Sequence, residues 1–364
     1  MKIRVLSFML ALVAQTQVFQ VSSFFLKVSI FVVFFLLSVL SVNAQQSQPI
    51  TQFFFNRFML NPAAAGSQGY SSVGMTIKDQ WTGFGNSPTV QVLYGQYRLS
   101  RQGFSGNRNV NRSSSGNPER IGLGVALFND IRGPLRTTGA QFTYAYHLED
   151  QYGQLSFGLT GSIFQFYANR DKMITEHFDN YLASINLSRF IPDAMFGVHY
   201  TSSDYYAGLS VSNLFQSYLT FGGRNSRHYR IERQYTLLGG YVFEINRAWT
   251  VVPGLQYKLT DHFAQQLDFN LLLYWYDQLW GGFAFRTAGG GAVGGFNFLV
   301  GMRYREYHFG YAFDHSLSNM GRYSWGSHEL MLSITFGTYD KFFRYNRRYE
   351  FQEIQARRRV FNRN

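Results

Sequence analysis

Hydrophobic and polar residues alternate along most of this chain with the period of two that is typical of β-strands. In residues 266–276, for example, Leu271 and Trp275 fall on one face, whereas Asp268 and Asn270 fall on the other. Segments of about ten residues with this pattern are typical of tilted strands that cross a membrane with the apolar face toward lipid. About fourteen such segments follow one another, near residues 72–80, 88–99, 120–129, 136–148, 154–167, 194–201, 205–213, 234–245, 248–259, 265–276, 279–287, 294–304, 307–314 and 327–337.

The links between these segments alternate in length. Short turns occur at 149–153, 202–204, 245–247, 276–278 and 305–306, and the links that alternate with them occur at 81–87, 130–135, 168–193, 214–233, 260–264, 288–293 and 315–326. Because outer-membrane barrels keep their short turns in the periplasm, we expect both the N- and the C-terminus to be periplasmic. An even number of antiparallel strands also closes without an unpaired edge. We therefore predict an all-β fold, a transmembrane antiparallel up-and-down β-barrel of about 14 strands over residues 72–338.

A soluble β-sandwich is the structural alternative, because its strands also alternate. Aromatic residues make up 18% of this chain and charged residues only 15%, and helical periodicity is almost absent. The apolar faces also end in Tyr and Trp, as the interfacial girdles of membrane barrels do, which favours the barrel. The residues concerned are Trp249, Tyr257, Trp275, Trp280, Tyr304 and Tyr307.

Residues 1–44 have the features of an export signal. An uncharged apolar run at 28–43 follows Lys27, and Ala44 ends a Val-Asn-Ala sequence of the kind that signal peptidase selects. A pair of transmembrane helices within these residues is the alternative, which the different character of the whole chain after Ala44 disfavours. No run of 18 apolar residues follows Ala44, so we expect no transmembrane helix after the signal. We therefore predict a signal peptide over residues 1–44.

The next segment, 45–71, is aromatic but does not alternate, so we do not expect it to be a barrel strand. Its apolar side chains need burial, and small residues at predicted inward positions, such as Gly122, Gly158 and Gly310, leave space in the lumen. We predict a periplasmic or lumenal segment that folds as a plug, with a flexible lead-in as the alternative. The candidate plug residues are Phe53, Phe54, Phe55, Phe58, Met59 and Leu60.

Two basic segments interrupt the regular pattern of a chain whose net charge is +12. The link 100–119 and the tail 339–364 both fall on the predicted periplasmic side, where their positive field would steer acidic partners toward the barrel. We predict that they dock the barrel onto a periplasmic partner; solvated segments without a function are the alternative. The candidate docking residues are Arg101, Arg108, Arg112, Arg347, Arg348, Arg357, Arg358 and Arg359.

Signatures of catalysis and metal binding are weak or absent. The chain has no cysteine, which excludes disulfides and thiolate chemistry, and its eight histidines are scattered. It contains none of the motifs of zinc proteases, serine hydrolases or P-loop proteins. We predict that it is not an enzyme and has no catalytic, cofactor-binding or metal-binding residues. A general or substrate-specific porin is the functional alternative, although the small inward residues indicate a narrow or occupied lumen.

Several short sequence blocks follow one another along the chain. They are QFFFNRFMLNPAAAG at 52–66, KDQWTGFGNSP at 78–88, GLG with FND within 122–130, PD at 192–193, YYAGLS at 205–210, WGGF with FR within 280–286, FGYAFD at 309–314 and SHEL at 327–330. Together they resemble the PorP/SprF family, outer-membrane proteins of the type IX secretion system of Bacteroidetes. Asn86 stands where this family often has Gly, and Lys78 where it has Arg.

The resemblance implies a non-enzymatic barrel that assists secretion or surface anchoring of cargo proteins with a C-terminal signal domain. The implied partners are other type IX components, such as the periplasmic ring of the secretion and gliding machinery or peptidoglycan-linked lipoproteins, together with outer-membrane lipid. No cofactor and no nucleic acid is implied. Trp81 and Phe84, on the first outer link, are candidate contacts for cargo, with interfacial anchoring as the alternative.

Overall fold

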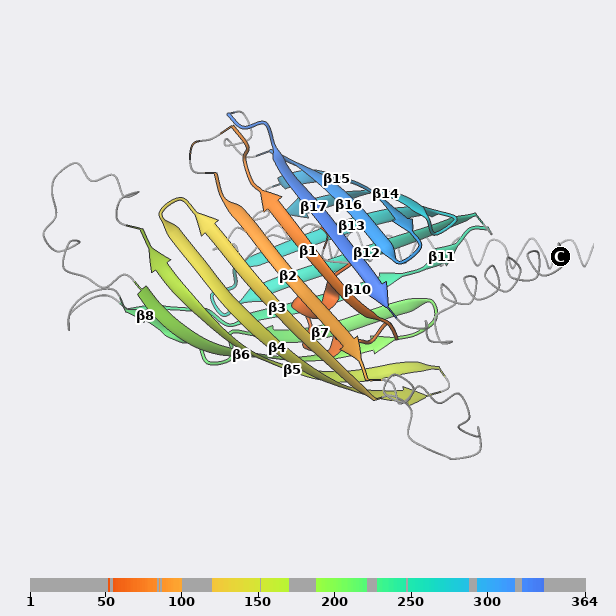
Figure 1. Ribbon diagram of the computed structural model, residues 1–364, viewed down its shortest axis with the longest axis horizontal. Coiled ribbons are helices and arrows are strands. Elements are labelled where there is room, and N and C mark those ends of the chain that lie inside the picture. The colour runs from red at the N-terminus through yellow and green to blue at the C-terminus, as the bar shows by residue number, and fades with distance from the viewer. Residues whose placement is uncertain are drawn as a thin grey trace, which may run out of the picture.

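Fourteen antiparallel strands form a closed barrel in the computed structural model of this chain (Figure 1). The sheet closes where β1 pairs with β17 and where β10 pairs with β12. The barrel strands are β1 (Ser71–Asp79), β2 (Thr89–Arg98), β3 (Ile121–Arg132), β4 (Leu135–Asp150), β5 (Gly153–Ala168), β6 (Ser188–Thr201), β7 (Tyr205–Ser212), β10 (Gln234–Tyr241), β12 (Trp249–Thr260), β13 (Gln265–Trp275), β14 (Leu279–Thr287), β15 (Val293–Tyr304), β16 (Tyr307–Ser316) and β17 (Ser327–Phe336). The structure describes residues 52, 55–83, 85, 87–99, 120–150, 152–169, 188–220, 228–246, 248–287, 293–317 and 323–336.

Smaller elements accompany the barrel. β8 (Tyr218–Thr220) and β9 (His228–Arg230) pair in a separate sheet, within a link for which the sequence predicted no strands. β11 (Phe243–Glu244) pairs with β12. Two 3-10 helices, η1 (Arg57–Met59) and η2 (Pro62–Ala64), precede β1. Within the part of the chain that the structure describes, no helix is long and apolar enough to cross a membrane.

The side chains of the barrel are distributed in the opposite way to those of a soluble protein. Outward positions carry exposed apolar residues such as Leu127 and Phe142, whereas buried inward positions carry polar residues such as Lys78, His147 and Glu329. A continuous belt of exposed apolar side chains is unfavourable in water, but it matches the lipid-facing band of a membrane barrel with a polar interior. The predicted fold, a transmembrane antiparallel up-and-down barrel of 14 strands, is thereby confirmed.

The alternation assigned inward and outward faces correctly in most strands. In β17, for example, Leu330 points outward and is exposed, and Met331 is buried in the lumen, as predicted.

The predicted link at 130–135 was too long. The pairing of β3 with β4 continues up to Arg132 and Leu135, so only a two-residue turn remains. Gly133 has a φ of +58° in this turn, a conformation that favours glycine.

We call the end of the barrel where β1 begins and β17 ends the terminal end, and the opposite end the loop end. Outward aromatic side chains gather at the terminal end. The ring centroids of Tyr205 and Tyr241 lie 6.5 Å apart, as do those of Trp249 and Trp275. Such a rim is typical of the membrane interface. Trp280, which the sequence analysis placed in this girdle, lies instead in the lumen, because it is one residue out of step with the outward face of β14.

Candidate functional site

The barrel is not empty. Residues 52 and 55–70, which we call the lumenal segment, lie inside it and include η1 and η2 (Figure 1). The sequence explains the compact turn at η2. Asn61 precedes this helix, and its Oδ1 accepts a hydrogen bond from the backbone N–H of Ala63 at 3.0 Å. Pro62 then supplies a φ that suits the first position of a helix.

Glycines in the barrel wall make room for the lumenal segment. A Cβ atom at Gly158 in β5 would collide with the backbone of Pro62 and Ala63. A Cβ atom at Gly122 in β3 would collide with the carbonyl oxygen of Ala65. The wall therefore approaches the backbone of the segment so closely that only glycine fits at these two positions.

Both ends of the lumenal segment are hydrogen-bonded to the wall. The backbone N–H of Gln52 donates to Glu329 Oε1 in β17 at 2.9 Å. At the other end, the backbone N–H of Gly66 donates to Gln96 Oε1 at 3.1 Å, and the Arg98 guanidinium donates to the Gly66 carbonyl oxygen at 3.0 Å. The segment is thus attached to the last strand of the barrel and to the second strand.

The middle of the lumenal segment is also hydrogen-bonded to the barrel wall. Asn61 Nδ2 donates to the backbone carbonyl of Val198 in β6 at 2.9 Å, and His147 Nε2 donates to the carbonyl of Ala65 at 3.0 Å. Asn61 and His147 are completely buried. Because a buried polar group that loses its partner costs about 1–3 kcal/mol, these bonds favour one position of the segment in the lumen.

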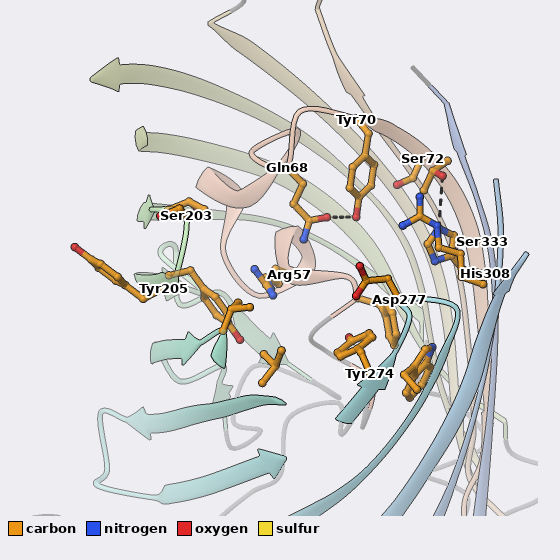
Figure 2. Close-up of a pocket in the computed structure, with 18 of the residues that line it drawn as sticks. Arg57, Gln68, Tyr70, Ser72, Ser203, Tyr205, Tyr274, Asp277, His308 and Ser333 are labelled. Atoms are coloured by element: carbon orange, nitrogen blue, oxygen red, sulfur yellow. Dashed lines mark hydrogen bonds between the residues drawn. The ribbon is translucent and has the colours of Figure 1, made fainter. Parts of the chain in front are cut away.

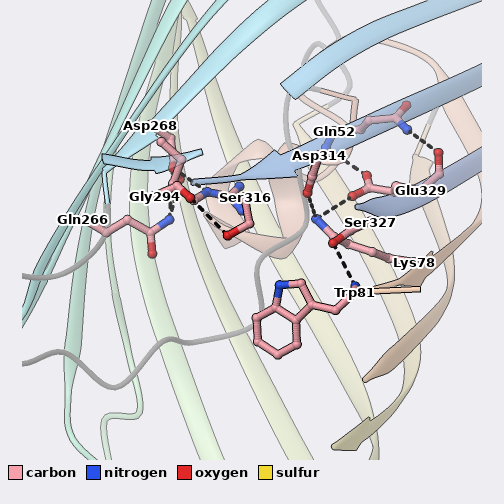
Figure 3. A network of polar contacts seen from close by, with 11 residues as sticks. Gln52, Lys78, Trp81, Gln266, Asp268, Gly294, Asp314, Ser316, Ser327 and Glu329 are labelled. Carbon is pink, nitrogen blue, oxygen red and sulfur yellow. Dashed lines mark hydrogen bonds and ion pairs between the residues drawn. The ribbon is translucent and has the colours of Figure 1, made fainter. Parts of the chain in front are cut away.

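Buried ion pairs lie at both attachment points, and Figure 3 shows the one beside Gln52. Lys78 in β1 forms an ion pair with Asp314 in β16 and lies 3.5 Å from Glu329, the residue that binds Gln52. The side chains of Lys78, Asp314 and Glu329 are only 2%, 13% and 0% exposed. At the other end, Arg98 is ion-paired with a glutamate of β4 at 2.6 Å. One buried cation between two carboxylates is costly to remove, because both carboxylates lose an ion-pair partner at once.

Cavities lie on both sides of the lumenal segment. The terminal-end cavity, of about 160 Å³, contains Arg57, whose guanidinium carbon lies 3.6 Å from the ring centroid of Tyr206 (Figure 2). The loop-end cavity, of about 390 Å³, is lined by Met59 and Leu60. Neighbouring residues around η1 therefore face opposite cavities. An aqueous path along the barrel axis has to pass this segment.

The structure brings the described plug candidates together in the lumen. The ring centroid of Phe55 lies 4.8 Å from that of Trp280, and the ring centroid of Phe58 lies 6.2 Å from that of Tyr94. Phe55, Phe58, Met59 and Leu60 all belong to, or pack against, buried apolar clusters of the barrel interior. Phe53 and Phe54 lie outside the described residues. That the segment closes the lumen to solutes stays a prediction.

Trp81, a predicted cargo contact, lies in the β1–β2 link at the loop end. Its backbone N–H donates to Ser327 Oγ at 3.1 Å, which joins this link to the start of β17 (Figure 3). Phe84 lies outside the described residues. Sequence reasoning did not single out Tyr323 and Trp325 in the adjoining β16–β17 link, although they are 73% and 82% exposed. Their signal in the sequence was the presence of two aromatic residues in a predicted outer link.

Other predicted segments lie outside the residues that the structure describes. They are the signal peptide, the basic link and tail, and the docking residues Arg101, Arg108, Arg112, Arg347, Arg348, Arg357, Arg358 and Arg359. In the part that is described, no group of three or more His, Cys, Asp or Glu residues is placed to hold a metal ion.

A closed barrel with an apolar outer belt and a polar, occupied interior defines an integral β-barrel protein of the outer membrane. The chain belongs to the PorP/SprF family of type IX secretion system membrane proteins, because its sequence matches that family over residues 42–334. The resemblance of the sequence blocks is thereby confirmed. This family of secretion-system barrels is non-enzymatic in kind.

Solved outer-membrane proteins show distant similarity. The outer membrane protein Omp33 of Acinetobacter baumannii has a TM-score of 0.43 and 11% identity, over 73% of this chain and 97% of that chain. A FadL homologue of Pseudomonas aeruginosa has a TM-score of 0.43 and 9% identity, over 76% of this chain and 91% of its own. A search of curated proteins found no match to the sequence.

Proposed function

We propose that this chain is a non-enzymatic outer-membrane component of the type IX secretion and gliding machinery. It assists secretion or surface anchoring of cargo proteins that carry a C-terminal signal domain. The observation that carries this proposal is membership of the PorP/SprF family over residues 42–334. The occupied lumen supports it, because a porin needs a continuous aqueous path, whereas residues 55–70 lie inside this lumen and are hydrogen-bonded to the wall along their length.

The link lengths support an orientation with the terminal end in the periplasm. The terminal end carries the short turns 202–204, 276–278 and 305–306, whereas the links between β5 and β6 and between β7 and β10 at the loop end are long. Outer-membrane barrels place short turns in the periplasm and long loops outside. Both chain termini and the basic link between β2 and β3 then belong to the periplasmic side.

In this orientation the basic segments dock the barrel onto the periplasmic ring or onto peptidoglycan-linked lipoproteins. Their arginines include Arg101, Arg112 and Arg357. A positive field beneath the barrel raises the rate at which acidic partner surfaces meet it. Cargo is contacted at the loop end by Trp81 and Phe84 of the β1–β2 link and by the exposed side chain of Trp325 in the adjoining link.

Loss of the protein tests the proposal against the porin alternative. We expect a deletion strain to lose surface display of a cargo protein with a type IX signal domain, while uptake of small solutes continues at the rate of the parent strain. The measurement compares surface proteolysis of cargo with solute uptake, and plasmid-borne wild-type protein is the control. Normal cargo display together with impaired uptake of a solute would show that the chain is a porin.

The tail gives a second test. Truncation after Thr338, or exchange of Arg357, Arg358 and Arg359 for Glu, is expected to reduce crosslinks between the barrel and its periplasmic partner in whole cells. Exposed charge pairs are screened as the Debye length falls to about 3 Å at 1 M salt, so the complex should also dissociate at high salt. Exchange of the same three residues for Lys keeps the charge and should keep the crosslinks. Full crosslinking and secretion by the Glu variant would mean that the tail is only solvated.

A further inference from the structure

The loop-end cavity has no part in the proposed secretion role. It is larger than the terminal-end cavity, at about 390 Å³, and lies within the range of small-ligand sites, about 300–1,000 Å³. Its floor is the lumenal segment, and its wall includes Phe128 and Phe164, whose ring centroids are 6.5 Å apart. A concave site with aromatic surface and a few convergent polar groups is typical of small-molecule binding.

Two buried oxygen atoms of residues that line this cavity have no hydrogen-bond partner among the residues that the structure describes. Asp193 is 4% exposed, and its Oδ1 accepts hydrogen bonds from the backbone N–H groups of Ala194 at 2.7 Å and Phe215 at 3.2 Å. These bonds fix the carboxylate, but its Oδ2 is unpartnered. Asn56 Oδ1, on the floor, is unpartnered as well. Because buried acceptors in native proteins are nearly always hydrogen-bonded, both atoms are available to a donor from water or from a ligand in this cavity.

The charges that line the cavity balance one another. Asp130 is ion-paired with Arg132 at 2.8 Å, which leaves Asp193 and one buried cation, Lys258 in β12. Lys258 makes no hydrogen bond or ion pair within the described part of the chain, so its ammonium group is a donor that an acceptor on a ligand would satisfy. The complementary ligand is uncharged overall, both donates and accepts hydrogen bonds, and has an apolar face for the aromatic wall.

We propose that the loop-end cavity binds a neutral saccharide. Sugar hydroxyl groups both donate and accept, so they can donate to Asp193 and Asn56 and accept from Lys258. The C–H face of a sugar ring packs against Phe128 and Phe164. A neutral peptide also offers donors and acceptors, but its backbone groups are spaced along an extended chain, whereas these groups surround one compact cavity.

Calorimetric titration of the full-length protein tests this inference. The protein is held in an amine-oxide detergent, because maltoside detergents are themselves saccharides. The probes are the methyl glycosides of glucose, mannose, galactose and N-acetylglucosamine, with a blocked triglycine peptide as the comparison. We expect saturable binding of at least one glycoside and none of the peptide. Asp193→Asn keeps Oδ1 but replaces the free acceptor by a donor, so it should weaken binding about 10- to 100-fold.

Asp277→Asn is the matched control, because it makes the same exchange in the lining of the terminal-end cavity and should leave the affinity unchanged. If Asp193→Asn does not fold, Lys258→Met and Asn56→Leu provide the same comparison. The inference is overturned if no glycoside binds, if only the peptide binds, or if the variants of the loop-end cavity bind the glycoside as tightly as the wild-type protein.

Discussion

Exchange of Gly158 for valine should displace the lumenal segment and open the barrel to ions. The new side chain would collide with the backbone of Pro62 and Ala63, which cannot move aside as a flexible side chain would. Overpacking of this kind costs about 1–3 kcal/mol, which raises the ratio of displaced to docked segment about 5- to 150-fold. In planar lipid bilayers, the variant should open more often, or conduct more, than the wild-type protein.

The same strand offers a matched control. A Cβ atom at Gly161 would meet no atom within 4 Å, so Gly161→Val should leave the conductance unchanged. Deletion of residues 50–66 should increase the conductance as Gly158→Val does, without adding a side chain to the wall. Slower migration of the boiled than of the unboiled protein on a gel shows that each variant is a closed barrel. Equal conductance of all these proteins would mean that the segment does not close the lumen.

Exchange of Lys78 for methionine should destabilise the barrel strongly. Lys78 is the cation between Asp314 and Glu329, and its loss removes an ion-pair partner from two buried carboxylates at once. Removal of one partner from a buried ion pair typically costs about 3–5 kcal/mol. The measurement is the free energy of unfolding in denaturant, with the barrel folded into lipid vesicles.

Arg132→Met provides the comparison, because Arg132 also pairs with an aspartate but its side chain is 40% exposed. The Arg132→Met variant should lose only about 0–1 kcal/mol of its free energy of unfolding. Adding Glu329→Gln to Lys78→Met removes one of the two carboxylates that lost this partner and should restore part of the stability. A Lys78→Met barrel as stable as the Arg132→Met barrel would show that the buried cluster is held by water or relaxed packing and not by its cation.

The sequence predicted the wall of the barrel well because a strand has only two faces. Once Leu330 was placed toward lipid, the inward direction of Met331 followed from the backbone. The same rule places Trp280 inward with Ala284, so its assignment to the outer girdle from its aromatic type alone is wrong. β8 and β9 were missed because three-residue strands are too short to show a period.

The interior was harder to predict. The aromatic, non-alternating segment indicated burial, but no local pattern shows which lumenal groups it meets. Gln52 and Glu329 are 277 residues apart along the chain, and Trp81 and Ser327 are 246 apart. Such contacts depend on the curvature of the closed sheet and on the register of every strand between the two residues. The sequence shows the polar inward positions, whereas only the three-dimensional arrangement shows their partners.

The position of Glu329 has a consequence for how the barrel is built. In the seam that closes the barrel, Lys78 of β1 lies directly opposite Glu329 of β17. Alternation alone does not define this register, because a slip of two residues leaves every side chain on its proper face. Such a slip moves Glu329 by about 7 Å along the strand, away from both Lys78 and Gln52. A barrel closed in the wrong register therefore loses both the buried ion pair and the hydrogen bond that holds the lumenal segment. The lumenal segment thus stabilises the native register of the closing seam over a shifted one.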